Sequence, residues 1–466
     1  MRPPEMRGPD RRAAWLPRAL AVFAVVAMLV TGCAPAPAPS RASSGATSSP
    51  VTSASVPAPT ATPEPSPTPL SRDDGWRADI DALLEARERL HPDPWHGTAR
   101  ADWVAAADAV KARIPDMTDD EALTELVRLA SMPGWAGRDG HSGIFPFIPG
   151  SGTHEYPITM WQFPEGLVIT RARAPYESSV GSRIVAIEGR PIAEVLALAD
   201  PLAPRDNPSN LLAYGPLYLR VSELLAGVGV IDEPGPATFT LEAPSGATRD
   251  LVIEPILADD DVAWHGGDPI DLPVGEPLWL SRPTETLWWE VLPDDETLFV
   301  QYNVVEARID PIVDEILARV QEGDIERVVV DLRHNGGGNL NTYRHFLDVL
   351  QDPAIDRPGR LVVLIGRLTF SAAATFATEL EATTGAWFAG EDMGGSPNLY
   401  GDARSTDLVN SGQQVYIASR YHQISTPDDA RVTIEPELPV PYTFDDYRAG
   451  RDPVLDTVLL EAVKGV

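Results

Sequence analysis

Hydrophobic residues follow three patterns along the chain, and each pattern predicts a different kind of structure. From residue 76 to about 133 they recur at helical spacing, with Ile80 and Leu83 on one face, which predicts short amphipathic helices. Between about 153 and 255, short apolar runs are bounded by Gly, Pro or acidic turns, which predicts strands. From about 280 to the end, continuously apolar strands alternate with helical segments, as is typical of a parallel sheet covered on both faces.

The positions of several elements can be predicted from the same patterns. Thr118 and Glu121 have the spacing of a capping box, so we expect a helix to begin there. The stretch 181–192 predicts a strand, a Gly-containing turn and a helix start in succession. Strands are also expected at 166–170, 238–241, 297–302, 327–331 and 361–365, and helices around 309–320, near 343–350 and from Ser371.

The first 71 residues differ from the rest in composition. Five Arg precede an apolar run at 19–30, which is too short for a spanning helix and has the flanks of a secretory signal. The run leads to Leu-Val-Thr-Gly-Cys33, which resembles a bacterial lipoprotein signal and implies that the Cys33 thiol is diacylated. The alternative is an ordinary signal peptide with an incidental cysteine. We therefore expect a lipoprotein signal peptide at 1–32 and a Pro/Ala/Ser/Thr-rich tether at 33–71.

Composition narrows the chemistry that the folded part can use. Cys33 is the only cysteine, which excludes internal disulfides, zinc sites built on several cysteines and a cysteine nucleophile in the folded part. The formal net charge is −31, and removal of residues 1–32 takes away five Arg and two acids, so the mature chain carries −34. Such a surface repels nucleic acid and anionic headgroups. We expect no nucleic-acid partner, and membrane contact only through the lipid on Cys33.

Ser371 is the candidate nucleophile. It lies in Thr-Phe-Ser-Ala-Ala-Ala (369–374), between an apolar strand and an alanine-rich helix. A serine in this position is by default a helix N-cap. The strand, turn and helix context also exposes a serine oxygen above a sheet and leaves the amide of Ala372 able to point at a developing oxyanion.

A glycine loop follows the preceding strand, in Asp-Leu-Arg-His-Asn-Gly-Gly-Gly-Asn (331–339). It lacks the Lys-Ser or Lys-Thr of a phosphate-binding loop, which argues against a nucleotide. Glycines there permit positive φ and can turn backbone amides toward an oxyanion, although a tight turn would look the same. We expect Arg333 and Asn335 to brace this loop.

A nucleophilic serine needs a base. Only Lys111 and Lys464 are available as lysines, one in the helical segment and one at the C-terminus, so a Ser/Lys dyad is improbable. Among eight histidines, His141 lies in a polar turn, Arg-Asp-Gly-His-Ser-Gly (138–143), that could present it into a cleft. His334 and His422 are its rivals. No pair of histidines has metal spacing, and we expect neither a metal nor a cofactor.

At these residues the chain resembles the tail-specific, or C-terminal-processing, serine peptidases, including the branch related to the tricorn core. The resemblance covers most of 72–460. It is carried by Asp-Gly-His-Ser at 139–142, Asp-Leu-Arg-His-Asn-Gly-Gly-Gly at 331–338, Thr-Phe-Ser-Ala at 369–372 and the closing segments 434–440 and 450–455.

The resemblance implies a role for individual residues. Ser371 matches the nucleophile, and the amides of Gly337 and Ala372 match the oxyanion donors. Ser396 stands where the Ser/Lys branch has its lysine, which favours the histidine-using branch, with His141 as the base. Gly140 replaces a serine that precedes the tricorn-type histidine. The family's distal glutamate is best matched by Glu435, with Glu437 and Glu391 as alternatives.

The resemblance also implies an architecture and an activity. We expect an α/β fold, with a crotonase-like (ClpP/crotonase) peptidase core at 280–466, a helical N-terminal subdomain at 72–150 and an inserted PDZ-like β domain at 151–260. The expected function is that of a lipid-anchored serine endopeptidase acting on peptides or proteins at the outer face of the bacterial cytoplasmic membrane. The alternative is a non-catalytic surface lipoprotein that binds peptides or apolar ligands on the same scaffold. The oligomeric state stays open.

Overall fold

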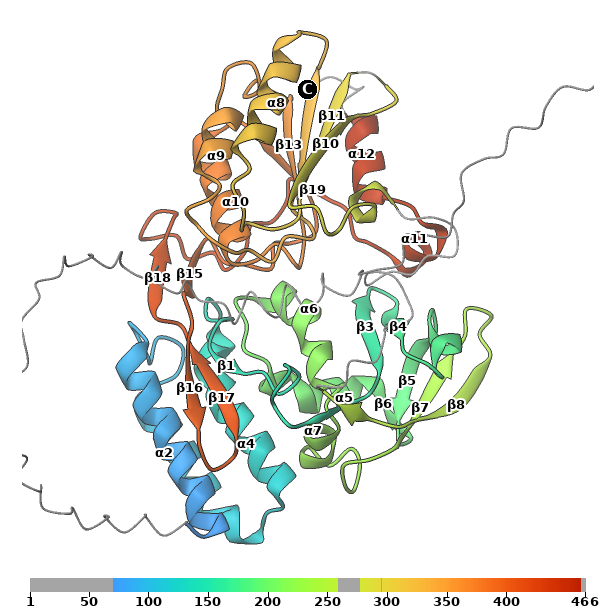
Figure 1. The fold of residues 1–466 in the computed structure, drawn as a ribbon. Helices are drawn as coiled ribbons and strands as arrows, with labels where there is room; N and C mark the ends of the chain where they lie inside the picture. Colours follow the sequence, from blue (N-terminus) through green and yellow to red (C-terminus); the bar gives the residue numbers. More distant parts are fainter. Residues whose placement is uncertain (1–69, 259–276, 295, 462–466) are drawn as a thin grey trace, which may run out of the picture.

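The computed structural model describes residues 70–258, 277–294 and 296–461 (Figure 1). The predicted signal peptide, Cys33 and nearly all of the tether lie outside these residues. Figure 1 shows an upper part built on one sheet, and a lower part that combines the N-terminal helices with a second sheet. Within the described residues, no helix has both the length and the apolar character that crossing a membrane requires.

The upper part is built on a six-stranded sheet in the order β10-β11-β12-β13-β14-β19. Its strands are β10 (Leu287–Val291), β11 (Thr297–Tyr302), β12 (Arg327–Asp331), β13 (Leu361–Ile365), β14 (Trp387–Gly390) and β19 (Leu438–Pro439). All neighbours are parallel except β10, which pairs antiparallel with β11 at the edge. The predicted parallel sheet is therefore confirmed, and the strands expected at 297–302, 327–331 and 361–365 are confirmed residue for residue.

Helices cover both faces of this sheet. One face carries α8 (Asp310–Gln321), α9 (Arg344–Leu350) and α10 (Ala372–Thr383), while α11 (Phe444–Ala449) and α12 (Pro453–Glu461) pack on the other (Figure 1). Side chains alternate accordingly along β12, because Val328 and Val330 pack with α8–α10, whereas Val329 packs with α11 and α12. Such two-sided burial explains why the strands read as unbroken apolar runs.

The N-terminal part consists of α2 (Arg72–Leu90), α3 (Arg100–Arg113) and α4 (Asp119–Ser131). The predicted capping box is present, with the Thr118 hydroxyl accepting the Glu121 amide and the Glu121 carboxylate accepting the Thr118 amide. Short 3-10 turns follow α3 and α4, at Ile114–Asp116 and Met132–Ala136. The second of these turns leads into the segment that carries His141.

The middle part contains an antiparallel sheet in the order β3-β4-β5-β7-β8, with β6 paired to β5. Its strands are β3 (Ile158–Phe163), β4 (Gly166–Ala172), β5 (Arg183–Ile187), β6 (Arg190–Pro191), β7 (Ala237–Glu242) and β8 (Thr248–Ile253); β2 (His154–Glu155) pairs separately with β9 (Ile256–Leu257). Helix α5 (Ile192–Ala199) begins directly after β6, so the expected order of strand, turn and helix start is confirmed. Phe163 and Val168 pack into the second face of the upper sheet.

The stretch 201–232 lies between β6 and β7 and is mainly helical. It contains α6 (Pro208–Tyr218) and α7 (Ser222–Gly227), and it follows a 3-10 turn at Asp200–Leu202. Helix α7 packs against α4, so this insertion joins the middle part to the N-terminal helices. Two more 3-10 turns lie at Glu177–Ser179 and Leu278–Leu280.

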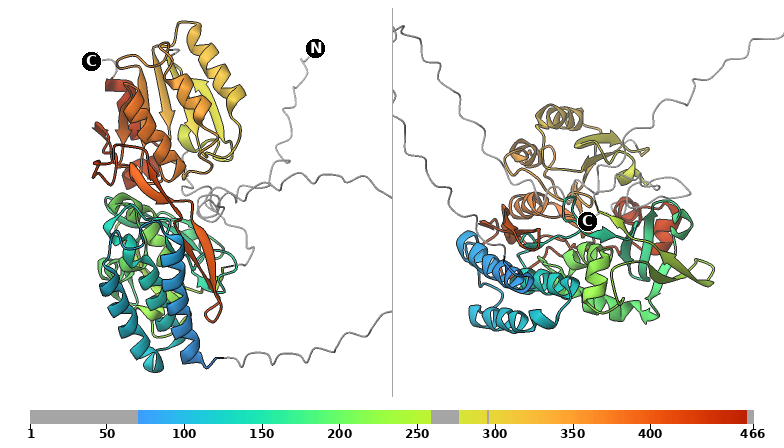
Figure 2. Two further views of the ribbon diagram at one scale, coloured as in Figure 1. Left: turned by 90° about the vertical axis from the view of Figure 1, so that its left-hand side faces the viewer. Right: turned by 60° about the horizontal axis from the view of Figure 1, so that its bottom comes forward.

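A long excursion from the C-terminal part was not expected from the sequence. After β14 the chain forms β15 (Asn398–Gly401), β16 (Arg404–Leu408), β17 (Gln413–Ile417) and β18 (Arg420–Gln423). The β16–β17 hairpin runs down along α2 and pairs with β1 (Gly143–Ile144) (Figures 1 and 2). Its apolar side chains enter the N-terminal core, so residues 404–417 pack with the helical subdomain and not with the rest of 280–466.

Candidate active site

Ser371 lies in the turn between β13 and α10, at the N-cap position of the helix. Its side chain makes no capping hydrogen bond, and its Oγ lies 2.9 Å from Nε2 of His141. The backbone of Ser371 has φ 53° and ψ −124°, which is strained for a residue with a side chain and costs about 1–3 kcal/mol. The capping alternative is thus not what the structure shows, and the strain directs the hydroxyl at a histidine.

The glycine loop lies directly against this turn. A Cβ atom added to Gly337 would lie 2.6 Å from the Cβ of Ser371 and 2.8 Å from the amide nitrogen of Ala372. Gly337 has φ 109°, so a larger residue is excluded by both space and backbone conformation. The two segments that the sequence analysis paired are therefore adjacent in space.

The two predicted oxyanion donors differ in this structure. Ala372 opens α10, so its N–H has no acceptor within the helix and is available to an incoming group. The Gly337 N–H, in contrast, already donates to Oδ1 of Asn335 at 3.0 Å, and Nδ2 of Asn335 donates to the Tyr302 carbonyl at 2.8 Å. In this conformation the Gly337 amide is occupied by the bracing residue Asn335, so its role as an oxyanion donor stays a prediction.

Arg333 braces the other side of the loop. Its guanidinium bonds to the carboxylates of Asp331 and Asp452, and all three side chains are buried or nearly so. Its charged group also lies 4.9 Å from the centre of the Trp279 ring. Arg333 therefore ties the end of β12 to the start of α12, as the sequence analysis expected of a bracing residue.

His141 reaches Ser371 from the N-terminal part of the chain, 230 residues away in sequence. Its ring stacks on Phe370 with 4.5 Å between ring centres and an interplanar angle of 19°. Phe370 is buried in the N-terminal core cluster although it directly precedes Ser371. This one aromatic side chain thus links the nucleophile's turn to the base's turn.

The turn that carries His141 is held by bonds from three distant segments. The amide of Gly140 donates to Oδ1 of Asp206 at 2.7 Å, and the amide of Ala418 donates to Oγ of Ser142 at 2.9 Å. The backbone of Arg138 is bonded on both sides, because its amide donates to the Asp206 carbonyl and its carbonyl accepts the Tyr400 amide, each at 2.8 Å.

The protonation state of His141 suits a base. The side chain is 5% exposed, and burial lowers its pKa to about 4, against the opposing effect of the Asp139 carboxylate. The ring is therefore neutral at neutral pH, as acceptance of a proton requires. Because Nε2 accepts the serine proton, the neutral ring must carry its own hydrogen on Nδ1. The Tyr400 backbone carbonyl favours protonation of the ring, although Nδ1 makes no hydrogen bond of regular geometry within the described residues.

The structure corrects the assignment of Glu435. This residue is exposed, and its charge acts on Asp392. The charged groups that act most strongly on His141 in the described part of the chain are Asp139, His422 and Asp402, and Glu435 is not one of them. Its neighbour Ile434 is buried in the core of the upper part, while the Glu435 side chain is exposed to solvent.

The two alternatives to Glu435 make contacts that stabilise the upper part of the fold. Glu437 accepts the amide of Phe388 at 2.8 Å, and Glu391 pairs with Arg367 at 2.6 Å. Ser396, which stands at the lysine position of the Ser/Lys branch, is fully buried and donates its hydroxyl to the Val432 carbonyl at 2.7 Å.

The rival histidines take other places. His334 is buried with its ring edge-on to Trp279, 6.0 Å between ring centres. Nε2 of His422 lies 3.6 Å from Asp402, and both residues act electrostatically on His141. Asp139, Asp206 and Tyr400 also shape this site and were not predicted. Only Asp139 has a local signal in the sequence, because it stands two residues before His141.

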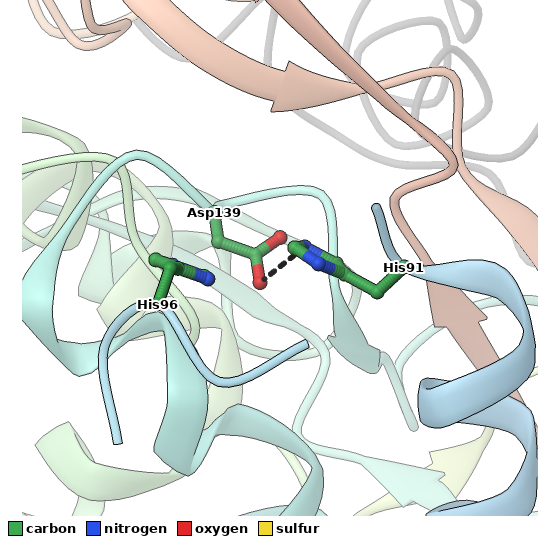
Figure 3. A group of neighbouring side chains, drawn as sticks. All are labelled: His91, His96 and Asp139. Carbon is green, nitrogen blue, oxygen red and sulfur yellow. Dashed lines mark ion pairs between the residues drawn. The ribbon is translucent and has the colours of Figure 1, made fainter. Parts of the chain in front are cut away.

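Asp139 belongs to a buried cluster with His91 and His96 (Figure 3). The imidazole and carboxylate atoms that these three residues offer lie within 4.8 Å of one another. Burial alone would raise the pKa of Asp139, but the Arg87 guanidinium at 2.9 Å and His91 together hold it well below its usual range. Asp139 is therefore a permanent anion beside the His141 turn.

The donor set of this cluster does not suit a metal ion. Nδ1 of His91 accepts the amide of Asp93 at 3.1 Å, so the ring hydrogen is on Nε2, the atom that would have to bind the metal. Nε2 instead faces Asp139 at 3.3 Å, as the dashed line in Figure 3 marks. Because Arg87 already neutralises Asp139, a divalent cation would add uncompensated positive charge. The cluster is better described as the buried Arg87–Asp139 ion pair with His91 and His96 beside it.

A cleft of about 870 Å³ opens beside the nucleophile. It lies between the end of the glycine loop, α10 and the β15–β18 pair, and its lining includes Asn339, Thr375, Asp402 and His422. Thr375 bonds to the backbone carbonyl of Ser371, so the cleft lies one helical turn from the candidate nucleophile, and neither Ser371 nor His141 is in its lining.

Comparison with known proteins gives a fold but no close relative. No family model matches the chain, and no curated protein matches it. The structure of mature CPAF aligns with a TM-score of 0.55 at 13% identity, covering 85% of this chain and 99% of CPAF. Mature CPAF in complex with lactacystin aligns with a TM-score of 0.56 at 14% identity, covering 85% of this chain and all of CPAF. The chain has the fold of mature CPAF.

A further structural neighbour is the photosystem II D1 C-terminal processing protease, with a TM-score of 0.37 at 14% identity, covering 83% of this chain and 99% of the protease. The shared CPAF fold extends over both the upper sheet and the lower part, because 85% of this chain is covered. Ser371 and His141, which come from these two parts, therefore belong to one architecture.

Proposed function

We propose that this protein is a serine endopeptidase of the tail-specific type that uses His141 as its base. The observation that carries the proposal is the 2.9 Å contact between Oγ of Ser371 and Nε2 of a buried, neutral His141. A strained serine backbone beside a glycine loop adds support, because such strain is kept where function needs it. The shared fold with mature CPAF is consistent with the proposal.

In the proposed reaction, His141 accepts the proton of Ser371 as Oγ attacks a peptide carbonyl. The Ala372 N–H stabilises the oxyanion, and the Gly337 N–H joins it once Asn335 Oδ1 releases or shares that hydrogen. His141 then returns its proton to the leaving amine, and water hydrolyses the acyl-enzyme. Each step uses groups of the chain itself, with peptide and water as the other reactants.

The finer architecture is part of this proposal. We assign the upper sheet with α8–α10 to a crotonase-like core, which the parallel order β11-β12-β13-β14 supports. We assign the antiparallel sheet with α5 to a PDZ-like domain, which the succession β5, β6 and α5 supports. The packing of Phe163 against the upper sheet offers a route by which peptide binding in the middle part could act on the core.

The cellular location is likewise a proposal. The sequence Leu-Val-Thr-Gly-Cys33 supports lipid anchoring at the outer face of the bacterial cytoplasmic membrane, with 33–71 as a tether. Metabolic labelling with an alkyne-bearing fatty acid would be lost in Cys33→Ala if this assignment is correct. Retained labelling in that variant would contradict it.

A fluorophosphonate probe tests the proposed activity on the full-length protein. The wild type is expected to become labelled at Ser371, as mapped by mass spectrometry, and Ser371→Ala is expected to remain unlabelled. Since mature CPAF has been solved with lactacystin bound, lactacystin is a suitable competitor for the labelling. Peptide-library digestion would then show endopeptidase products.

A folded wild type that neither reacts with the probe nor cleaves any peptide would favour the non-catalytic binding protein instead. The full-length chain is the form to test, because residues 153–258 include Asp206, which bonds to the His141 turn, and α7, which packs against α4, so a variant without them would lose the site itself.

A further inference from the structure

Asp206 lies in the helical insertion of the middle part, directly before α6. Its side chain is fully buried. Oδ1 accepts the amide of Gly140 at 2.7 Å, and Oδ2 accepts the amide of Ser396 at 3.0 Å. One carboxylate therefore joins two loops that are far apart in the sequence.

Both loops border the reacting residues. Gly140 directly precedes His141 in the chain. The loop of Ser396 packs on the nucleophile's turn, because the amide of Gly395 donates to the Thr369 carbonyl at 2.9 Å. A Cβ atom added to Gly395 would lie 2.3 Å from the Cβ of Ala374, in the first turn of α10. Asp206 thus connects the turn of the base to the turn of the nucleophile.

Helix capping does not explain Asp206. The N-cap of α6 is the next residue, Asn207, whose Oδ1 accepts the amide of Asn210 at 2.8 Å. Nδ2 of Asn207 donates to the carbonyls of Met393 and Val432, at 2.9 and 2.8 Å. Asn207 therefore both caps α6 and bonds to the backbone beside the Ser396 loop. The Asp206 carboxylate is not needed for either contact and accepts the amides of Gly140 and Ser396.

We propose that Asp206 is a positioning residue that holds His141 against Ser371 only while its carboxylate is ionised. This inference rests on the proposed serine-peptidase function and adds a control of it by pH. The ionised group offers acceptors to both amides at once. After protonation, one oxygen becomes a neutral hydroxyl that accepts more weakly and must place its own hydrogen beside an N–H donor, so one of the two bonds is weakened and the His141 turn is loosened on one side.

The surroundings place this change near neutral pH. Burial and the nearby Asp139 carboxylate raise the pKa of Asp206 to about 7, against the opposing effect of the Gly140 and Ser396 amides and the Arg138 guanidinium. Tyr214 also interacts with it, and burial raises the pKa of that phenol above the physiological range. A carboxyl group whose pKa is shifted this far by its surroundings is typical of a functional position.

His141 itself cannot produce the same change. Its pKa is lowered to about 4, so the ring stays neutral throughout the range in which Asp206 titrates. If His141 alone limited the reaction, the rate would fall only below about pH 4. If Asp206 controls the geometry, the rate falls already as the pH drops through about 7.

The test is the rate of fluorophosphonate labelling at Ser371 between pH 5 and 9, measured on full-length wild type, Asp206→Asn and Asp200→Asn. The carboxamide of Asp206→Asn offers one acceptor and one donor, so it imitates protonated Asp206 at every pH. We expect wild-type labelling to fall about 100-fold through a midpoint near pH 7, as a misplacement of about 1 Å would cause. Asp206→Asn should show the low rate throughout. Asp200→Asn removes a carboxylate that lies just before the same insertion and whose pKa is also raised by burial, and this variant should keep the wild-type profile.

A wild-type midpoint near pH 4, or a wild-type profile in Asp206→Asn, would overturn the proposal. Should Asp206→Asn fail to fold, the wild-type midpoint decides alone. Hydrogen exchange at pH 8 adds a readout of position. Peptides that cover 138–142 and 393–397 should lose protection together in Asp206→Asn, and retained protection in both would count against the proposed link.

A measurement without activity separates this inference from the proposed function. The folded state holds the Asp206 proton more tightly than the unfolded state, so the contribution of Asp206 to wild-type stability falls as pH rises from about 4 to 7. The melting temperature of Asp206→Asn should therefore rise relative to wild type over that interval. If no labelling occurs at any pH, the peptidase proposal fails, and the melting comparison still shows whether Asp206 titrates near neutrality.

Discussion

The two halves of the candidate site are built in different ways. The Ser371 half consists of turns at the ends of the adjacent parallel strands β12 and β13, and Gly337 fits against Ser371 within that core. The His141 half is one turn held by Asp206, Tyr400 and Ala418, which come from other parts of the chain. The nucleophile's geometry therefore follows from the core, while the base's geometry depends on packing between parts.

This difference predicts that function can be lost from one half without loss of the fold. Replacing His141 by Ala should lower the rate of probe labelling at Ser371 by about 10³-fold or more, because no other side chain of the described residues bonds to Oγ of Ser371. Far-UV circular dichroism should remain that of the wild type. His345→Ala is a matched control, since His345 lies on the surface and pairs only with Asp314 in the described residues. Equal labelling of His141→Ala and wild type would remove His141 from the mechanism.

The Ser371 half should respond in the opposite way, with a loss of stability. Arg333→Ala would leave the buried carboxylates of Asp331 and Asp452 without their cation, which costs about 3–5 kcal/mol of unfolding free energy. Chemical denaturation measures this loss. Arg100→Ala removes an exposed pair with Glu88 and should cost less than about 1 kcal/mol. Similar losses in both variants would mean that the loop is not braced through Arg333.

The same division explains what the sequence could predict. The strands β11, β12 and β13 and the contact between the glycine loop and Ser371 follow from local apolar runs and turn residues, so they were predicted correctly. Helix α4 with its capping box was likewise predicted from neighbouring residues. Each of these features depends on interactions within short stretches of chain or between successive strands.

Features that depend on long-range packing were not predicted. Asp206 bonds to Gly140 and Ser396 across 66 and 190 residues, and no local pattern marks it. The β16–β17 hairpin reads as part of the C-terminal segment, but it packs in the N-terminal core. Glu435 was matched by its place in a motif, and only the path of the chain before β19 shows that it faces solvent.

The buried state of His141 predicts a pH dependence of stability. Because folding lowers its pKa from 6.5 to about 4, the neutral ring stabilises the fold above about pH 6.5, and this stability is lost as pH falls toward 4. The loss amounts to about 3 kcal/mol. His141→Gln cannot titrate, so it does not suffer this loss. The difference in unfolding free energy between the variant and wild type should therefore shift in favour of the variant by about 3 kcal/mol between pH 7 and pH 4. Parallel curves for the two proteins would show that the His141 turn is open to solvent.

The smallest expected effect concerns Glu435. Its exposed carboxylate lies outside the contacts that hold His141, so Glu435→Gln should change the labelling rate less than twofold at pH 8. Asp139→Asn provides the contrast, because it removes the buried anion that opposes the lowering of the His141 pKa. A tenfold loss in Glu435→Gln would mean that the chain segment before β19 moves onto the His141 turn when substrate binds. The base's half would then be completed only in the complex, and the contrast with the preformed Ser371 half would be sharper still.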